Sequence, residues 1–261
     1  YGLWFGFLRF RRINLIIVGR RKRNVMKLYK YLSDKTFRDH LQSHLNGEVH
    51  FSSWREFNDP MEGFFVYIAK GDTRNQIDAI VGEKTAYRVS CFCRSWKKFL
   101  LWSYYTNKHR GVCLEFEVNK KNLPANYSLD PINYDPTLPQ FDSSLSPVEQ
   151  AKKFLLTKMR PWKQEGEWRL LGRNLQQYTV PFGRLTGIIF GANYADGDPN
   201  DATRQQVVHE SRSIGKLHPV LYQAYIEGNT PEIRRSVLDC YDQNRIQVNW
   251  RLPTRQIQLT R

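Results

Sequence analysis

The amino-acid sequence predicts an α+β protein with a mixed, mostly antiparallel sheet at its core and helices at its periphery. Its 261 residues are 41% hydrophobic and include 15 Phe, 14 Tyr and 7 Trp, enough to fill a sizeable core. Stretches that alternate apolar and polar residues, as strands do, are interleaved with stretches of helical periodicity. They lack the regular spacing of strand–helix–strand units, which argues against a doubly wound parallel fold.

The first half of the chain has apolar–polar alternation typical of four strands. These strands are expected over residues 27–32, 48–53, 87–93 and 112–118. Helices are expected over residues 34–45, around residues 77–81 and over residues 99–106.

The second half contains a strong helix start, Ser146-Pro147-Val148-Glu149. Pro is tolerated in the first helical turn, and the Ser and Glu side chains match a capping box. We expect this helix to end near Met159, and strands to follow over residues 167–172 and 185–190. Beyond Gly191, we expect helices over residues 202–210, 217–226 and 231–238 and edge strands within residues 246–259.

Composition divides the chain into three parts. Residues 1–25 form a basic N-terminal extension, residues 26–191 an α+β core domain, and residues 192–261 an appendage of helices and strands packed on the core. The apolar stretches of the extension are interrupted by Arg9 and Arg11, so no run approaches the ~20 residues needed to span a bilayer.

The net charge of +15 predicts a polyanionic partner, of which nucleic acid is the commonest. Seven of these charges lie in residues 1–25, which weakens the argument for the core itself. Among the four cysteines, Cys91 and Cys93 alternate within an apolar run. We therefore expect reduced thiols, a cytoplasmic location and no metal site, because a zinc site would need a second closely spaced Cys or His pair.

Four short motifs occur in order along the chain. They are Leu28-Tyr29-Lys30-Tyr31, then Phe57-Asn58-Asp59-Pro60-Met61-Glu62, then Leu101-Trp102-Ser103-Tyr104-Tyr105 leading to His109-Arg110-Gly111-Val112-Cys113, and finally Trp162 with Glu165-Gly166-Glu167-Trp168-Arg169. Together they resemble the bacterial family known as domain of unknown function 2971, over about residues 26–191. The chain differs from many members at Tyr104, where His is expected, and in the helical stretch after Gly191.

The layout of the motifs is also similar to that of ADP-ribosyltransferases. Those enzymes carry Arg or His on the first strand, a Ser/Thr-rich or aromatic second strand and a catalytic Glu on a late strand. Lys30, Ser52 and Glu167 occupy comparable places here, with Lys30 as a departure. The resemblance implies an ADP-ribosyltransferase-like fold and an enzyme that consumes NAD as substrate and modifies nucleic acid or protein. It also implies a role as a toxin or phage-defence effector, with an antitoxin or other neutralising protein as partner.

Glu167 is the candidate catalytic residue. Cleavage of the bond between nicotinamide and ribose develops positive charge on the sugar, which a carboxylate stabilises. On a strand, Glu165 would share a face with Glu167, so that one holds ribose and the other activates the acceptor. A surface salt bridge between Glu167 and Arg169 is the structural alternative. The candidate NAD-binding residues are Lys30, Tyr29, Ser52, Asn58, Asp59, Trp102 and Tyr105.

Several of these residues have structural interpretations as well. Trp102 and Tyr105 are three residues apart, which is also typical of a helix stripe that faces a core. Asn58 and Asp59 precede a proline, as residues that cap a turn often do.

Two other functions remain open from the sequence. Glu115, Glu117 and Lys120 place two acids on one strand face near a Lys, which would suit a metal-dependent nuclease. The basic composition would suit a non-catalytic nucleic-acid-binding module, whose binding would weaken with salt.

Overall fold

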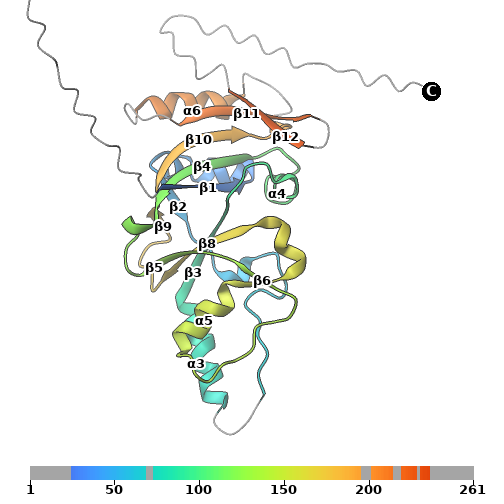
Figure 1. Ribbon diagram of the computed structural model, residues 1–261. Helices are drawn as coiled ribbons and strands as arrows, with labels where there is room; N and C mark the ends of the chain where they lie inside the picture. Colours follow the sequence, from blue (N-terminus) through green and yellow to red (C-terminus); the bar gives the residue numbers. More distant parts are fainter. Residues whose placement is uncertain (1–24, 69–72, 195–200, 214–218, 228–229, 236–261) are drawn as a thin grey trace, which may run out of the picture.

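An eight-stranded sheet forms the centre of the structure (Figure 1). A computed structural model describes residues 25–68, 73–194, 201–213, 219–227 and 230–235. The strands of the sheet are β1 Val25–Leu32, β3 Tyr87–Cys93, β4 Val112–Asn119, β5 Tyr127–Pro131, β8 Glu167–Arg173, β10 Arg184–Phe190, β11 Val220–Glu227 and β12 Thr230–Arg235.

Their order across the sheet is β12-β11-β10-β4-β1-β3-β8-β5. Only β10 and β11 pair in parallel; the other neighbouring strands are antiparallel. The predicted α+β class with a mixed, mostly antiparallel sheet is therefore confirmed.

Helices and two small sheets surround this core. The α-helices are α1 Asp34–Asp39, α2 Leu41–Leu45, α3 Thr73–Ala86, α4 Phe99–Tyr105, α5 Pro147–Leu155 and α6 Ala202–Ser213. Short 3-10 helices are η1 Trp54–Glu56, η2 Lys120–Asn122 and η3 Arg160–Glu165. The small sheets pair β2 Glu48–His50 with β9 Thr179–Pro181 and β6 Asn133–Asp135 with β7 Thr157–Met159. None of the described helices is long and apolar enough to cross a membrane.

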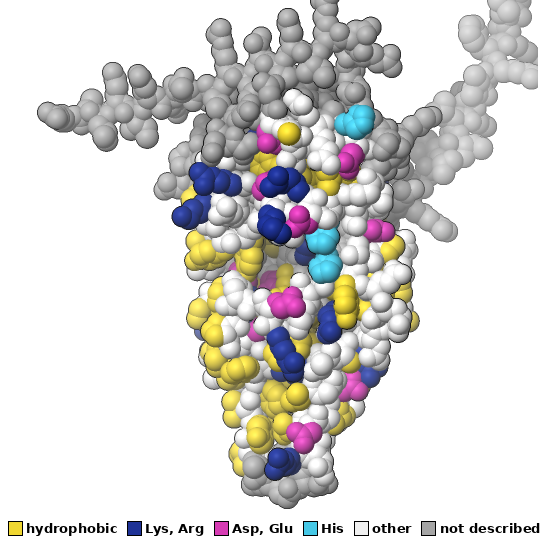
Figure 2. Space-filling view, turned by 180° about the vertical axis from the view of Figure 1, so that it is seen from behind, with side chains coloured by type: hydrophobic (Ala, Val, Ile, Leu, Met, Phe, Trp, Pro, Cys, Tyr) yellow, Lys and Arg dark blue, Asp and Glu magenta, His cyan; other side chains and the backbone are white. Residues whose placement is uncertain are grey.

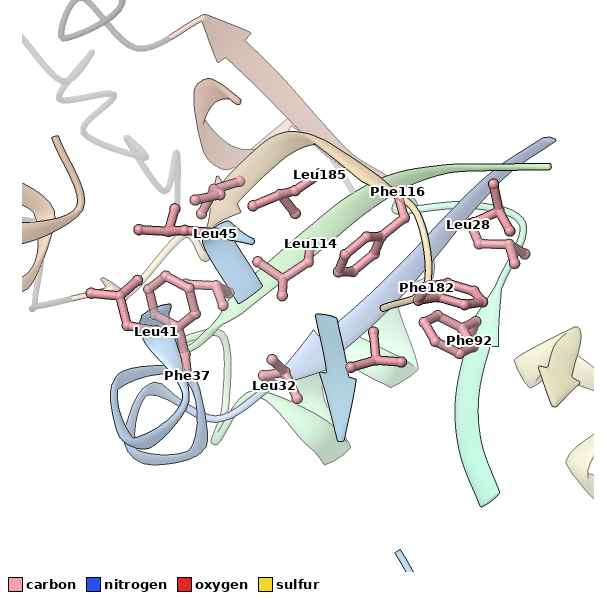
Figure 3. Packing of buried hydrophobic residues seen from close by; sticks show 14 of the residues in the cluster. Leu28, Leu32, Phe37, Leu41, Leu45, Phe92, Leu114, Phe116, Phe182 and Leu185 are labelled. Atoms are coloured by element: carbon pink, nitrogen blue, oxygen red, sulfur yellow. The ribbon is translucent and has the colours of Figure 1, made fainter. Parts of the chain in front are cut away.

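The larger apolar core lies against one face of the sheet, with α1 and α2 at one end and Phe92 and Phe182 at the other (Figure 3). Alternate residues of β1 and β4 point into it, as expected for strands with one apolar face. They include Leu28, Leu32, Leu114 and Phe116. The two helices contribute Phe37, Leu41 and Leu45. This packing fixes the half of the sheet made by β10, β4 and β1.

Strands β1 and β3 diverge, so that the sheet is open between them. Strand β1 pairs with β4 along its whole length, from Val25 to Leu32, but its register with β3 consists of Tyr29 opposite Cys93. Further along, β3 pairs with the segment after β2, because Ser52 and Val89 exchange both backbone hydrogen bonds at 2.9 Å. In Figure 1, β10, β4 and β1 accordingly run together, and β3, β8 and β5 run below them in another direction. Strands that diverge in this way leave space between them.

The predicted helices over residues 217–226 and 231–238 are wrong. Residues 220–227 form β11, which pairs in parallel with β10, and residues 230–235 form β12, which pairs with β11. Pairing with an existing strand overrides a weak local helix preference. The sheet thus continues past Gly191, while the three-part division of the chain stays a prediction. The basic extension, apart from Val25, and the edge strands expected within residues 246–259 lie outside the described residues.

Several element boundaries also differ from those predicted. The helix expected over residues 34–45 is broken at His40, and the strand expected over residues 48–53 ends at His50. The helix that starts at Pro147 has the predicted capping box but ends at Leu155, and β7 follows it. Because the helix ends earlier, Lys158 belongs to β7 and its side chain is buried beside the site described below.

Candidate functional site

The space between the diverging strands is a pocket of about 270 Å³. Figure 2 shows the face behind that of Figure 1, hollowed near its middle, with acidic and basic side chains around the hollow. Seven predicted site residues line the pocket: Glu167, Glu165, Lys30, Tyr29, Ser52, Asn58 and Tyr105. The other lining residues are Tyr31, Glu56, Phe57, Val89, Cys91, Phe92, Cys93 and Leu101.

Glu167 is the first residue of β8 and is buried, with 6% of its surface exposed. Its carboxylate accepts a hydrogen bond of 2.7 Å from Nε of Arg169 and one of 3.1 Å from Nζ of Lys158. Burial alone would raise the pKa of Glu167, but the charges of Arg169 and Lys158 lower it to about 2. Its side chain is therefore a permanent negative charge in the pocket wall, and the predicted surface position of this pair is wrong.

Glu165 also lines the pocket, but it belongs to a different element from Glu167. It ends the 3-10 helix η3, so the prediction that Glu165 and Glu167 share a strand face is wrong. Gly166 between them adopts a left-handed conformation (φ 57°), which favours glycine and turns the chain from η3 into β8. The two carboxylates meet at Lys158, whose Nζ lies 2.6 Å from Glu165 and 3.1 Å from Glu167.

Arg169 anchors these charges to the rest of the fold. Its guanidinium is fully buried, and its five N–H donors are matched by five hydrogen bonds, to both carboxylate oxygens of Glu62, both of Glu167 and the backbone oxygen of Leu155. We call the set of Glu62, Lys158, Glu165, Glu167 and Arg169 the charged cluster. It contains three carboxylates and two cations, and two of the carboxylates, Glu165 and Glu167, line the pocket.

Lys30 enters the pocket from the opposite strand, β1. Its Nζ donates to the hydroxyl of Ser90 at 2.9 Å and to the backbone oxygen of Cys91 at 3.3 Å, across the gap where β1 and β3 no longer pair. Loss of water around the ammonium lowers the pKa of Lys30, although the nearby charge of Glu167 opposes this. Lys30 thus satisfies backbone that the parting of the strands would leave unpaired.

Tyr105 and Asn58 complete the wall beside Glu165. The hydroxyl of Tyr105 donates to Glu165 at 2.8 Å and lies 3.3 Å from the side-chain oxygen of Asn58. Burial and the carboxylate both raise the pKa of Tyr105, so its hydroxyl keeps its proton. Burial likewise raises the pKa of the Cys91 thiol, which leaves it neutral beside Glu167 rather than a thiolate nucleophile.

Two predicted NAD-binding residues do not line the pocket. Trp102 is fully buried in a second apolar cluster, and its indole N–H donates to the backbone oxygen of Trp96 at 2.8 Å. Asp59 is buried and accepts a hydrogen bond of 2.9 Å from the backbone N–H of Met61, as residues that cap a turn do. Both have the structural roles that the sequence left open.

The residues suggested for a nuclease do not line the pocket, and each has its own partners. Glu115 accepts from Lys27, Tyr29 and Thr186, whereas Glu117 pairs with Arg184. Lys120 pairs with Asp130 at 2.9 Å. Within the described ranges, no group of three or more His, Cys, Asp or Glu is arranged to hold a metal ion.

Sequence reasoning missed Lys158 and Glu62. Lys158 lies in a segment that was expected to be helical. A helix there does not predict its contacts with Glu165 and Glu167. Glu62 is 107 residues away from Arg169 along the chain, so only the fold brings them together. The one available signal was the motif Phe57-Asn58-Asp59-Pro60-Met61-Glu62, which ends at Glu62.

Compared with protein-family models, curated proteins and solved structures, the chain matches none of them.

Proposed function

We propose that this chain is an NAD-consuming enzyme of the ADP-ribosyltransferase kind, with Glu167 as its catalytic carboxylate. The observation that carries the proposal is an ionised, buried Glu167 in the wall of a pocket between two diverging strands, with Lys30 on the opposite strand. Perturbed ionisable groups that converge in a cleft are typical of functional sites. The expected likeness to the family known as domain of unknown function 2971 is part of this proposal.

The size of the pocket suits one end of a dinucleotide. A volume of about 270 Å³ is near the lower limit of ligand pockets, which span roughly 300–1,000 Å³. Tyr29, Tyr31 and Phe57 supply flat apolar surface for a planar ring such as nicotinamide. Ser52 and Asn58 supply hydroxyl and amide groups that can hydrogen-bond ribose hydroxyls.

The charge of the pocket suits the reaction. The bond between nicotinamide and ribose carries positive charge at the ring nitrogen, and cleavage moves this charge toward the sugar. Glu167 stays ionised at neutral pH and is held by Arg169 and Lys158, so it faces that charge without having to reorganise. Its low pKa makes it a poor base, which fits electrostatic stabilisation rather than proton transfer.

The test is incubation of the full chain with NAD and measurement of nicotinamide release by chromatography. Glu167→Gln keeps the shape of the side chain but removes its charge, so release should fall by ~10²–10³-fold. Glu62→Gln is the matched control, because it also removes a carboxylate bound to Arg169 but does not line the pocket. We expect this control to lose stability and to keep nicotinamide release close to that of the wild type.

Thermal unfolding of each variant establishes that it is folded at the assay temperature. Equal release by the wild type and a folded Glu167→Gln variant would remove Glu167 from the reaction. No release by the wild type, with or without cell extract, would exclude the proposed function.

A further inference from the structure

A second hollow shares a wall with the pocket. It has a volume of about 190 Å³ and lies between α4 and η3. Its lining residues are Leu100, Tyr104, Pro161, Trp162, Gln164 and Glu165. Glu165 lines both hollows, so a group bound in the second one lies next to the carboxylate that faces the first.

Flat apolar surface dominates the second hollow. Tyr104 leaves 62% of its surface exposed. Trp162 is half-buried and lies with its ring 4.7 Å from the ammonium of Lys158. Exposed aromatic rings beside a hollow are the means by which proteins stack unpaired nucleic-acid bases.

The charges around this hollow are positive. Lys98 donates to the backbone oxygen of Gln164 at 2.9 Å, and the exposed Lys163 lies between Trp162 and Gln164 in the chain. Arg160 precedes Pro161, and after the hydrogen bonds that Thr137 donates to the carboxylate of Asp135, the charge of Arg160 contributes to the lowered pKa of that group. Apart from the buried Glu165, the hollow has no acidic lining residue. Lysines at the rim of an aromatic hollow suit a phosphate backbone, whereas they give no advantage for an uncharged peptide.

We propose that the second hollow binds a base of a single-stranded nucleic acid, and that this base is the acceptor of the ADP-ribosyl group. This inference rests on the proposed function and names its acceptor class. The base stacks on Tyr104 and Trp162, Lys98 and Lys163 contact its phosphates, and one of its nitrogens faces Glu165.

In the transfer step, the acceptor nitrogen supplies the electron pair of the new bond to the ribose carbon, and the bond from that carbon to nicotinamide breaks. Its electron pair stays on the nicotinamide nitrogen and neutralises the positive charge there. The proton of the acceptor nitrogen becomes acidic once the new bond forms, and Glu165 accepts it on a carboxylate that has lone pairs beyond those used by Tyr105 and Lys158.

The first measurement is binding of fluorescent single-stranded homopolymer oligonucleotides, DNA and RNA, without NAD. Tyr104→Ala and Trp162→Ala should each weaken binding about tenfold, the effect of losing one stacked base. Tyr178→Ala is the matched control, because Tyr178 is 49% exposed but lines neither hollow. Equal binding by Tyr104→Ala, Trp162→Ala and the control would overturn the proposal.

The second measurement follows label from the adenylate phosphate of NAD into oligonucleotides, alongside nicotinamide release. We expect Tyr104→Ala to lose transfer to the oligonucleotide while still releasing nicotinamide to water. Label that goes to protein in cell extract and not to nucleic acid would overturn the inference but leave the proposed function standing. Oligonucleotide binding that depends on Tyr104, with no nicotinamide release by the wild type, would instead overturn the proposed function and its acceptor together.

Discussion

Strands β4 and β8 lie in the same sheet and both are buried, but one face of β4 buries apolar side chains where the start of β8 buries charged ones. On β4, Val112, Leu114, Phe116 and Val118 point into the apolar core, and each is fully buried. On β8, Glu167 and Arg169 are on one face, with 6% and 0% of their surface exposed. That face of β4 removes apolar surface from water, and these two positions of β8 remove charge, although Leu170 and Leu171 of β8 and Glu115 of β4 are buried as well.

The two kinds of burial differ in what they contribute. Burying a Leu or Phe side chain stabilises a fold by about 1.5–3 kcal/mol. Burying an ion pair costs desolvation that the attraction between the charges often fails to exceed. The apolar face of β4 therefore accounts for the stability of the fold. The burial of the charged cluster is not explained by stability, and its place beside the pocket indicates a functional role instead.

The largest expected effect comes from Arg169→Met. Methionine has a similar length, but it removes the cation that pairs with the buried carboxylates of Glu62 and Glu167, and Glu167 keeps Lys158 alone. Removing one partner of a buried pair costs about 3–5 kcal/mol. Urea unfolding should show a loss of this size, comparable to that of Leu114→Ala, for which about 2–5 kcal/mol is expected.

A combined variant sharpens this result. Adding Glu62→Gln and Glu167→Gln to Arg169→Met removes the uncompensated charges, so part of the lost stability should return. Nicotinamide release should not return, because Glu167 is absent. No recovery of stability would mean that Arg169 acts by packing, like a residue of β4.

The next effect is the response of the protein to acid. The folded-state pKa of Glu167 is about 2, below the ordinary value of 4.5. Its charge therefore stabilises the fold above pH 4.5, and this contribution, roughly 3 kcal/mol, is lost as the pH falls from 4.5 toward 2. Urea unfolding of the wild type and Glu167→Gln at a series of pH values should show their stabilities converging over this range.

Glu117→Gln is the control for acid sensitivity. Glu117 is half-buried on β4 and pairs with Arg184, so its replacement should leave the acid response close to that of the wild type. Parallel curves for the wild type and Glu167→Gln would contradict the assignment of a buried, ionised carboxylate to β8.

The same contrast explains how much could be predicted from the sequence. The alternation of Val112, Leu114, Phe116 and Val118 is local, so the strand that contains them was predicted to within one residue. The strand of residues 87–93 was predicted with its observed bounds for the same reason. The buried apolar residues of a strand recur at every second position, so a single segment of sequence is enough to predict the strand.

The charged cluster has no such local pattern. Lys158 belongs to a three-residue strand behind a helix, and Glu62 to a turn, so their meeting with Glu165 and Glu167 depends on the whole fold. Six of the seven predicted residues that line the pocket belong to the four motifs, although Trp102 and Asp59 belong to the same motifs and only support the fold. A motif therefore marks the neighbourhood of the site without separating lining residues from supporting ones.

The smallest expected effect comes from Arg173→Ala at the far end of β8. Arg173 pairs with Glu83 of α3 through two hydrogen bonds of 2.9 Å, the same kind of contact that Arg169 makes with Glu62. Its side chain keeps 36% exposure, so water can solvate both charges once the pair is lost, and we expect a cost of at most about 1 kcal/mol. Urea unfolding compares it directly with Arg169→Met on the same strand. A similar loss for both would show that the charge of an Arg on β8, and not its burial, sets the cost, and the contrast between β4 and β8 would then lose its basis.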